Sequence, residues 1–428
     1  MSIFPLRKVI KRIMREQGIL QLELSRRTGI PQPTLSACLR GERSFSLDNV
    51  DKISEALGLP IGSLYPYIEL ELLDGRDQPG KMIRYIFRCF EIGLIDVGRK
   101  HLSFLETLDK YYYKDIFILG DKLNKLGYLY EASFLYTIII NKEKPSPILA
   151  TAYFRLFVIR KEGSREDAYE YAIYLMKYLD LLPKSIGVQL VGDSNDLRKD
   201  AYHQLIAFFS ERQNWNRVYE LSQKLALQYK DEQDSLNYGR SLILMATASF
   251  YQQNYKHALE VIDEYISIKD PNEEFLRWGI TQKYLVRIEL GEIKLIPEFI
   301  NWLIERGVEF NECASIILKA FSRRQMFDEM RDFFERYLET IYKNFEDGKK
   351  TNRDRIVLIQ IHLHYAQYLL YIKKEKVAVE VLLQVIQETG ELHLHGYLLE
   401  AFRLLTDVDL NAEQKMKLKL LLDHIRRC

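Results

Sequence analysis

Short runs of apolar residues at helical spacing fill the first 67 positions, and glycines follow most of them. Leu6, Val9, Ile10 and Ile13 share one face of a helix that Gly18 ends. The same pattern predicts five short helices, over residues 5–17, 21–28, 32–40, 46–57 and 61–67. So many short helices in so few residues predict one small globular unit.

From residue 81 onward the pattern changes to long amphipathic helices that come in pairs. Several segments repeat an aromatic residue, a short polar turn and a small residue that opens a second helix. These turn-following positions are Ala132, Ala168, Val218, Ala258 and Ala378, separated by 36, 50, 40 and 120 residues, and residues 291–303 and 324–341 fit as degraded copies. A period of about 40 residues predicts an α-solenoid of tetratricopeptide type with about eight or nine helix pairs. An irregular helical bundle is the alternative.

The segment LDGRDQPG at 73–80 holds two glycines, one proline and three charges, which is typical of a linker. The chain therefore divides into a head over 1–70, a linker over 71–80 and a helical array over 81–428. Residues 1–67 carry ten Lys/Arg and six Asp/Glu, although the formal net charge of the whole chain is only +1. A basic head on a near-neutral body is typical of a DNA-binding domain with a regulatory domain attached.

Composition favours an all-α protein, because prolines number 11 and hairpin-type turn dipeptides are sparse. Cys38, Cys89, Cys313 and Cys428 lie far apart and form no CxxC, which predicts a reduced, cytoplasmic protein without a disulfide or a zinc site. The N-terminal sequence lacks the apolar core of a signal peptide, and no long apolar stretch could span a membrane.

Residues 21–40, QLELSRRTGIPQPTLSACLR, meet the requirements of two helices that cross at a tight turn. Ser25 is small where the helices touch, and Gly29 suits a left-handed turn. Apolar residues stand where the pair faces the rest of the head, at Leu24, Ile30, Leu35 and Cys38. For Cys38 a core position is favoured over a redox switch.

This stretch resembles the Xre/Cro-like helix-turn-helix family, and the resemblance covers residues 5–67. Leu39 departs from it, since many members carry Glu there. The resemblance implies that helix 32–40 lies in the major groove of a double-stranded DNA operator. Gln32 would pair with adenine, and Pro33 could touch only apolar groups such as a thymine methyl. The further predicted base-reading residues are Thr34, Ser36 and Ala37, and the predicted phosphate contacts are Gln21, Arg26, Arg40 and Arg43.

Nothing in the sequence indicates catalysis. A P-loop, a dinucleotide fingerprint and an HExxH motif are lacking. His362 and His364, like His393 and His395, are two residues apart and would face different sides of a helix, so no shared metal is expected. We therefore expect a non-enzymatic protein without a cofactor.

A repressor-type head on helical repeats resembles the RRNPP group of peptide-pheromone receptors, which includes the phage arbitrium receptors. The resemblance implies a homodimer and a short signalling peptide bound to the concave face of the repeats. Amide and cationic side chains on first helices of repeats suit a peptide backbone and its carboxylate. The predicted peptide contacts are Asn237, Arg240, Arg277, Gln282, Tyr284 and Arg287. The alternative function is a regulator whose repeats are a protein-interaction scaffold with no peptide ligand.

Overall fold

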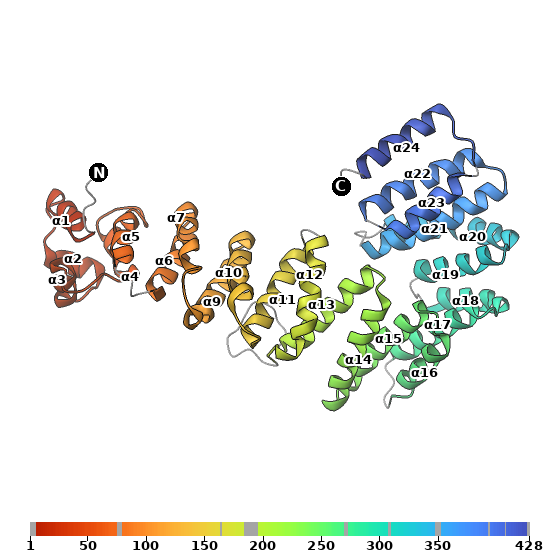
Figure 1. Cartoon of the computed structure of the whole chain (residues 1–428), viewed down its shortest axis with the longest axis horizontal. Helices are drawn as coiled ribbons and strands as arrows, with labels where there is room; N and C mark the ends of the chain where they lie inside the picture. The colour runs from red at the N-terminus through yellow and green to blue at the C-terminus, as the bar shows by residue number, and fades with distance from the viewer. Residues whose placement is uncertain are drawn as a thin grey trace. The chain divides into compact units, whose positions relative to one another are not determined.

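The computed structural model describes residues 6–74, 79–162, 165–183, 196–268, 273–306, 310–346, 352–392, 394–406 and 408–425. Throughout these ranges the regular structure is helical and no strand occurs, which confirms the all-α prediction. None of the helices in the described ranges is long and apolar enough to cross a membrane. The chain divides into two compact units, residues 1–204 and 205–428 (Figure 1).

The first unit begins with the predicted head, in which the first four helices are α1 (Leu6–Glu16), α2 (Gln21–Thr28), α3 (Gln32–Arg40) and α4 (Leu47–Ala56). Left-handed glycines follow all four, with φ of +68° at Gly18, +67° at Gly29, +86° at Gly41 and +66° at Gly58. Ser46 caps α4, because its Oγ accepts a hydrogen bond from the backbone N–H of Asn49 (3.2 Å).

The fifth helix differs from its prediction. α5 spans Tyr65–Asp74, whereas the sequence pattern placed it at 61–67. Gly62 has a φ of +90° in a turn, and Pro66 then occupies the first helical turn, where its missing N–H leaves no bond unmade. α5 therefore includes the first residues of the predicted linker, whose residues 75–78 lie outside the described ranges.

Helix pairs follow in the first unit. They are α6 (Pro79–Glu91) with the short α7 (Ile95–Lys100) and α8 (Leu102–Leu105), α9 (Tyr113–Lys125) with α10 (Leu129–Lys142), and α11 (Pro147–Glu162) with α12 (Arg165–Tyr178). The 3-10 turns η1 (Lys110–Tyr112) and η2 (Leu179–Leu181) stand before α9 and after α12. The first helices begin at 79, 113 and 147, which is a regular spacing of 34 residues. α13 (Leu197–Glu211) spans the division between the two units.

The second unit continues as stacked helices. They are α14 (Trp215–Asp231), α15 (Ser235–Tyr251), α16 (Tyr255–Ile266), α17 (Glu273–Glu289), η3 (Ile293–Leu295), α18 (Ile296–Arg306), α19 (Phe310–Arg323), α20 (Phe327–Glu346), α21 (Asn352–Tyr371), α22 (Glu375–Glu391), α23 (His395–Thr406) and α24 (Ala412–Ile425). The first helices of its pairs begin at 235, 273, 310, 352 and 395, close to the predicted period. This arrangement is a helical solenoid.

The predicted turn-following positions share one structural register. Each is the fourth residue of the second helix in a pair, and each is buried: Ala132, Ala168, Val218, Ala258 and Ala378. The two degraded copies have a larger side chain at the same position. Phe299 and Met330 are the buried fourth residues of α18 and α20. The sequence repeat therefore marks the place where the second helix packs against its neighbours.

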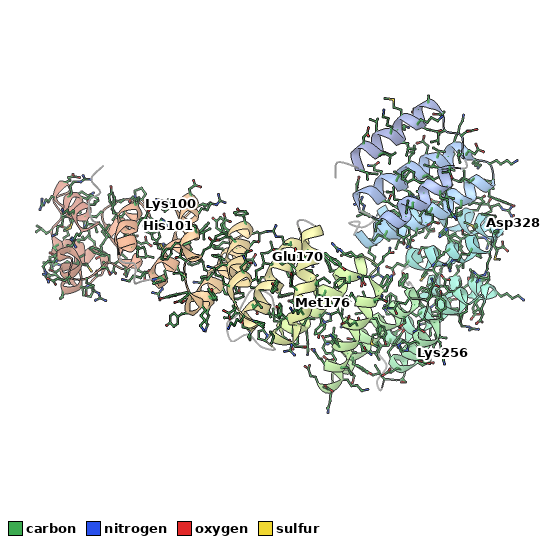
Figure 2. All side chains as sticks on the ribbon, viewed as in Figure 1. Lys100, His101, Glu170, Met176, Lys256 and Asp328 are labelled. Carbon is green, nitrogen blue, oxygen red and sulfur yellow. The ribbon has the colours of Figure 1, made fainter. Side chains whose placement is uncertain are left out.

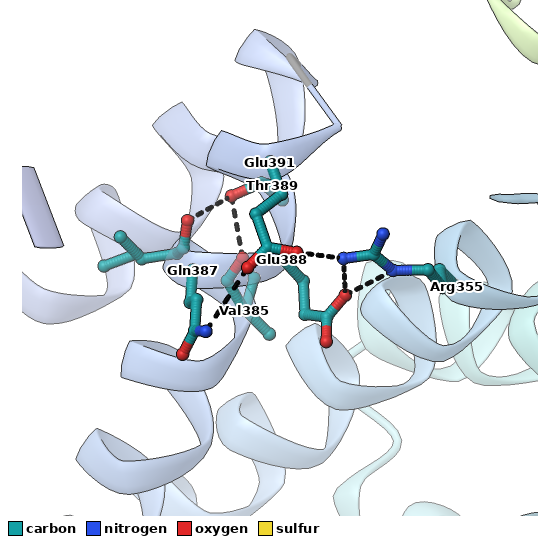
Figure 3. A network of polar contacts seen from close by, with 7 residues as sticks. Arg355, Val385, Gln387, Glu388, Thr389 and Glu391 are labelled. Atoms are coloured by element: carbon teal, nitrogen blue, oxygen red, sulfur yellow. Dashed lines mark hydrogen bonds and ion pairs between the residues drawn. The ribbon is translucent and has the colours of Figure 1, made fainter. Parts of the chain in front are cut away.

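Charged side chains add links between the helices of a pair. Arg355 on α21 donates from Nε to Glu388 Oε2 (2.6 Å) and from Nη2 to Glu391 Oε2 (2.5 Å), both on α22 (Figure 3). Partial burial by itself would lower the pKa of Arg355. The carboxylates of Glu388 and Glu391 outweigh this effect, so the pKa is raised. Beside them, Thr389 Oγ1 donates to the carbonyl oxygen of Val385 (2.7 Å) in its own helix. The network fixes the register of α21 against α22.

The turn between paired helices holds one residue in the left-handed region, two positions before the second helix. Glycine occupies it at Gly127, but Gln253 has a φ of +61° there, and Gln213, Gln325 and Lys373 take the same conformation. A side chain in this region costs about 1 kcal/mol, which glycine avoids.

Gln253→Gly is therefore expected to raise the free energy of unfolding by about 0.5–1 kcal/mol. A shift of the urea midpoint to higher concentration is the measurement. Gly127→Ala is the reciprocal control, because its new Cβ meets no atom within 4 Å and should cost about 1 kcal/mol through backbone conformation alone. A lower midpoint for Gln253→Gly would contradict the explanation.

The head and the first helix pairs share one core. A continuous cluster of buried apolar side chains runs from Leu6 in α1 to Leu156 in α11. Tyr65 and Tyr85 are fully buried at the junction, with ring centroids 5.6 Å apart, and Tyr85 Oη donates to the Tyr65 carbonyl oxygen (3.4 Å). The head is thus packed onto α6 rather than joined to it by the chain alone.

Polar bonds reinforce this junction at two places. Asp51 on α4 accepts hydrogen bonds from Tyr65 Oη (2.9 Å) and from Arg88 Nε on α6 (2.9 Å). Glu69 on α5 accepts from Lys100 Nζ (2.7 Å) at the end of α7 and lies 3.3 Å from Nε2 of the buried His101 (Figure 2). Burial acts to raise the pKa of Glu69, but Lys100 and His101 outweigh it and lower that pKa.

Candidate nucleic-acid interface

The α2–α3 turn is built as its sequence predicts. Ser25 donates from Oγ to the carbonyl oxygen of Ile30 (2.6 Å), which ties α2 to the residue that follows the turn. Thr28 Oγ1 accepts from the backbone N–H of Ile30 (3.2 Å) and donates to the carbonyl oxygen of Leu24 (2.7 Å). Together with the left-handed Gly29, these bonds fix the angle between the two helices of the motif.

α3 has one buried face and one accessible face. Leu35, Cys38 and Leu39 are buried in the head, so Leu39 is a core residue. Cys38 Sγ donates to the carbonyl oxygen of Ser44 (3.7 Å), and its burial confirms the preferred core position. The predicted base-reading residues lie on the rest of the helix: Gln32 exposed, and Thr34, Ser36 and Ala37 half-buried. Pro33 is exposed beside Gln32.

The predicted phosphate contacts differ in their surroundings. Arg26 and Arg43 are exposed, and Gln21 is half-buried as the first residue of α2. Arg40 instead holds both carboxylate oxygens of Glu42, at 2.6 and 2.9 Å, and donates to Ser36 Oγ (2.6 Å). The hydrogen bond with Glu42 raises the pKa of Arg40 and lowers that of Glu42. Glu42 therefore competes with a phosphate for the Arg40 guanidinium.

The predicted peptide contacts lie on α15 and α17, and their side chains do not all point to one surface. Asn237 donates from its backbone N–H and from Nδ2 to Asp234 (3.1 and 2.8 Å), so it helps to start α15. Arg240 Nη2 reaches Glu274 (3.3 Å) at the start of α17. Arg277 on α17 is exposed.

The remaining three candidates divide between neighbouring helices. Gln282 accepts from Tyr265 Oη (2.8 Å) and donates to Thr247 Oγ1 (2.8 Å), which places its amide among α15, α16 and α17. Tyr284 stacks on Phe299 of α18, and Arg287 binds Glu292 just beyond its own helix. Peptide binding by these six residues stays a prediction.

A different set of polar residues gathers around a hollow of about 390 Å³ in the second unit. Its lining consists of Arg212, Gln213, Asn214, Trp215, Asn216 and Gln252. Trp215 and Tyr251 stack with centroids 4.2 Å apart, and Gln252 donates to Asn216 (2.9 Å). Gln213 donates to Tyr397 Oη (3.1 Å), which also accepts from Gln360.

Tyr251 stays accessible at this open hollow, with 43% of its surface exposed. The neighbouring helices nevertheless withdraw its hydroxyl from bulk water and raise its pKa to about 12, with Glu312 adding to the shift. The sequence does not predict that Gln213 and Tyr397 meet, because they stand 184 residues apart. The polar turn QNWN at 213–216 was the one local signal.

Residues 10–64 match a family model described as Helix-turn-helix. The match spans the motif helices α2 and α3 with parts of the head on both sides. No curated protein matches the chain. The head is therefore a helix-turn-helix domain, which supports a DNA-binding transcription regulator.

Proposed function

We propose that this protein is a transcription regulator whose affinity for its operator is controlled by a short signalling peptide bound in the helical repeats. It acts without catalysis or cofactor, in the cytoplasm, as an RRNPP-type receptor built of tetratricopeptide-like repeats. The observation that carries the proposal is the helix-turn-helix head packed in one core with the first helix pairs of a solenoid. The motif accounts for DNA reading, so we assign the sensing of the signal to the array.

The hollow around Trp215 is where we place the peptide. Its amides, at Gln213, Asn214, Asn216 and Gln252, can both donate to and accept from a peptide backbone. The stacked Trp215 and Tyr251 offer an aromatic face for an apolar side chain. Arg212 supplies a cation for a carboxylate.

A homodimer belongs to the same proposal. One head offers a single short recognition helix, and helix-turn-helix proteins reach specific affinity by binding two half-sites at a fixed spacing. Most apolar side chains of the head helices, from Leu6 to Ile68, are used in the core that the head shares with the first helix pairs. We therefore place the dimer contact in the helical array.

The test uses synthetic peptides from short reading frames beside the gene, and it measures operator affinity and melting temperature with and without each peptide. One peptide is expected to change both the operator affinity and the melting temperature of the wild-type protein. Trp215→Ala should lower the affinity for that peptide by at least about tenfold, and it should leave DNA binding without the peptide unchanged.

Two variants serve as controls. Phe327→Ala removes an aromatic from a second stacked pair of the same geometry, with Tyr371 at 4.2 Å, and should leave peptide affinity unchanged. Asn237→Ala tests the site predicted from sequence. If Asn237→Ala alone lowers the affinity for the peptide, the site lies at the start of α15 and not at the hollow. If no peptide acts on the wild type, the receptor function is rejected in favour of a protein-interaction scaffold.

A further inference from the structure

α6 carries lysine and arginine side chains beside the predicted DNA-binding surface of the head. Lys81 Nζ donates to Ser44 Oγ (2.9 Å), and Ser44 lies in the exposed loop between α3 and α4, next to Arg43. Two turns further along α6, Arg88 binds Asp51 on α4. Two long side chains of α6 therefore reach the head, one at the loop that follows the recognition helix and one at α4.

The cations continue away from the head along α6 and onto α9. Arg84 stands three residues after Lys81, so the two share one exposed face of the helix. Arg84 also lines a hollow of about 200 Å³ together with Lys122 of α9, whose ammonium lies 4.3 Å from the Phe87 ring centroid. One carboxylate, Asp115, lines the same hollow and partly offsets these charges.

We propose that Lys81 and Arg84 bind DNA phosphates beside the half-site that the head reads. In helix-turn-helix complexes, elements flanking the recognition helix meet the sugar-phosphate backbone, and lysine and arginine supply many of those contacts. The shared core and the Asp51–Arg88 ion pair hold α6 at a fixed position on the head, so these cations are placed before DNA arrives. The DNA-contact surface then extends past residues 10–64, onto the first helix pair.

The salt dependence of DNA binding tests this inference. Full-length Lys81→Gln, Arg84→Gln and the double variant are titrated with an operator selected from a random library, and with a random-sequence duplex, over a range of salt concentrations. Each lost phosphate contact should reduce the slope of log affinity against log salt by about 0.9 and lower affinity about eightfold at about 0.1 M salt. Operator and random duplex should lose affinity alike, because phosphates carry no sequence information.

Three further variants separate phosphate binding from an effect on the junction. Ser44→Ala breaks the bond to Lys81 but keeps the cation, and Lys81→Arg keeps the charge, so both should preserve the slope. Lys256→Gln on α16 is the matched control for charge removal, also with an unchanged slope (Figure 2).

An unchanged slope in the double variant overturns the proposal. So does a loss in Ser44→Ala as large as that in Lys81→Gln, since the junction would then be the cause. A loss confined to the operator overturns it as well, since base readout would then be affected. The proposal does not depend on the peptide. If the wild type bound neither duplex, the result would reject DNA binding by the protein as a whole, not only the contacts proposed for Lys81 and Arg84.

Discussion

Gln32→Ala is expected to lower affinity for the operator by about five- to 150-fold, which corresponds to about 1–3 kcal/mol. Gln32 is the exposed first residue of α3, while Leu35 and Leu39 hold the opposite face of that helix in the core. Its carboxamide is therefore free to make a bidentate pair with an adenine edge in the major groove. Truncation to alanine removes both hydrogen bonds without disturbing the packing of the helix.

Fluorescence anisotropy with the selected operator and with a set of single-base variants measures the effect. The wild type should discriminate strongly at one base pair, and Gln32→Ala should lose discrimination there and nowhere else. Affinity for a random-sequence duplex is the control and should not change, because it depends on phosphate contacts. Equal losses on operator and random duplex would show that Gln32 contacts the backbone and that the recognition helix is misplaced.

Tyr85→Ala is expected to reduce the free energy of unfolding by about 3–5 kcal/mol, the range for a large aromatic removed from a core. Its ring is fully buried at the junction, 5.6 Å from the Tyr65 ring and 5.8 Å from His101. The void would lie between the head and α6, so both should lose protection together in hydrogen exchange measured on the full chain.

Tyr130→Ala is the matched control, because that side chain is 79% exposed and its loss should change stability by no more than about 0.5 kcal/mol. If Tyr85→Ala left the head as protected as in the wild type, the head would be an independent folding unit. The shared core would then contribute little to its stability.

The features that sequence predicted well are those encoded within a few neighbouring residues. Glycine stops and the Ser46 cap are read from local spacing, and the structure confirms them. The repeat positions such as Ala132 and Ala258 are also read from spacing, and the structure shows that they are buried fourth residues of second helices. The fifth helix was misplaced because Gly62 and Pro66 act together. Pro66 starts a helix there instead of interrupting one.

The junction was missed for a different reason. Its bonds join Asp51 to Arg88, 37 residues apart, and Glu69 to Lys100, 31 residues apart, across a segment whose composition is typical of a linker. A composition rich in glycine, proline and charge indicates a segment without regular structure. It does not indicate whether the helices on its two sides pack against each other. α6 did carry a signal, since Met82, Tyr85, Ile86 and Phe90 form a wide buried stripe that could have indicated a partner on more than one side.

The shared core also determines where this protein can be cut and recombined. A head excised after residue 70 would carry Tyr65 and Ile68 into solvent, stripped of the α6 side chains that cover them. The same head grafted onto another sensory array would meet a surface of unrelated shape. Recombination with other regulators therefore preserves a working head only where the exchanged piece also brings α6 to α8, so the unit of exchange is larger than the helix-turn-helix motif itself.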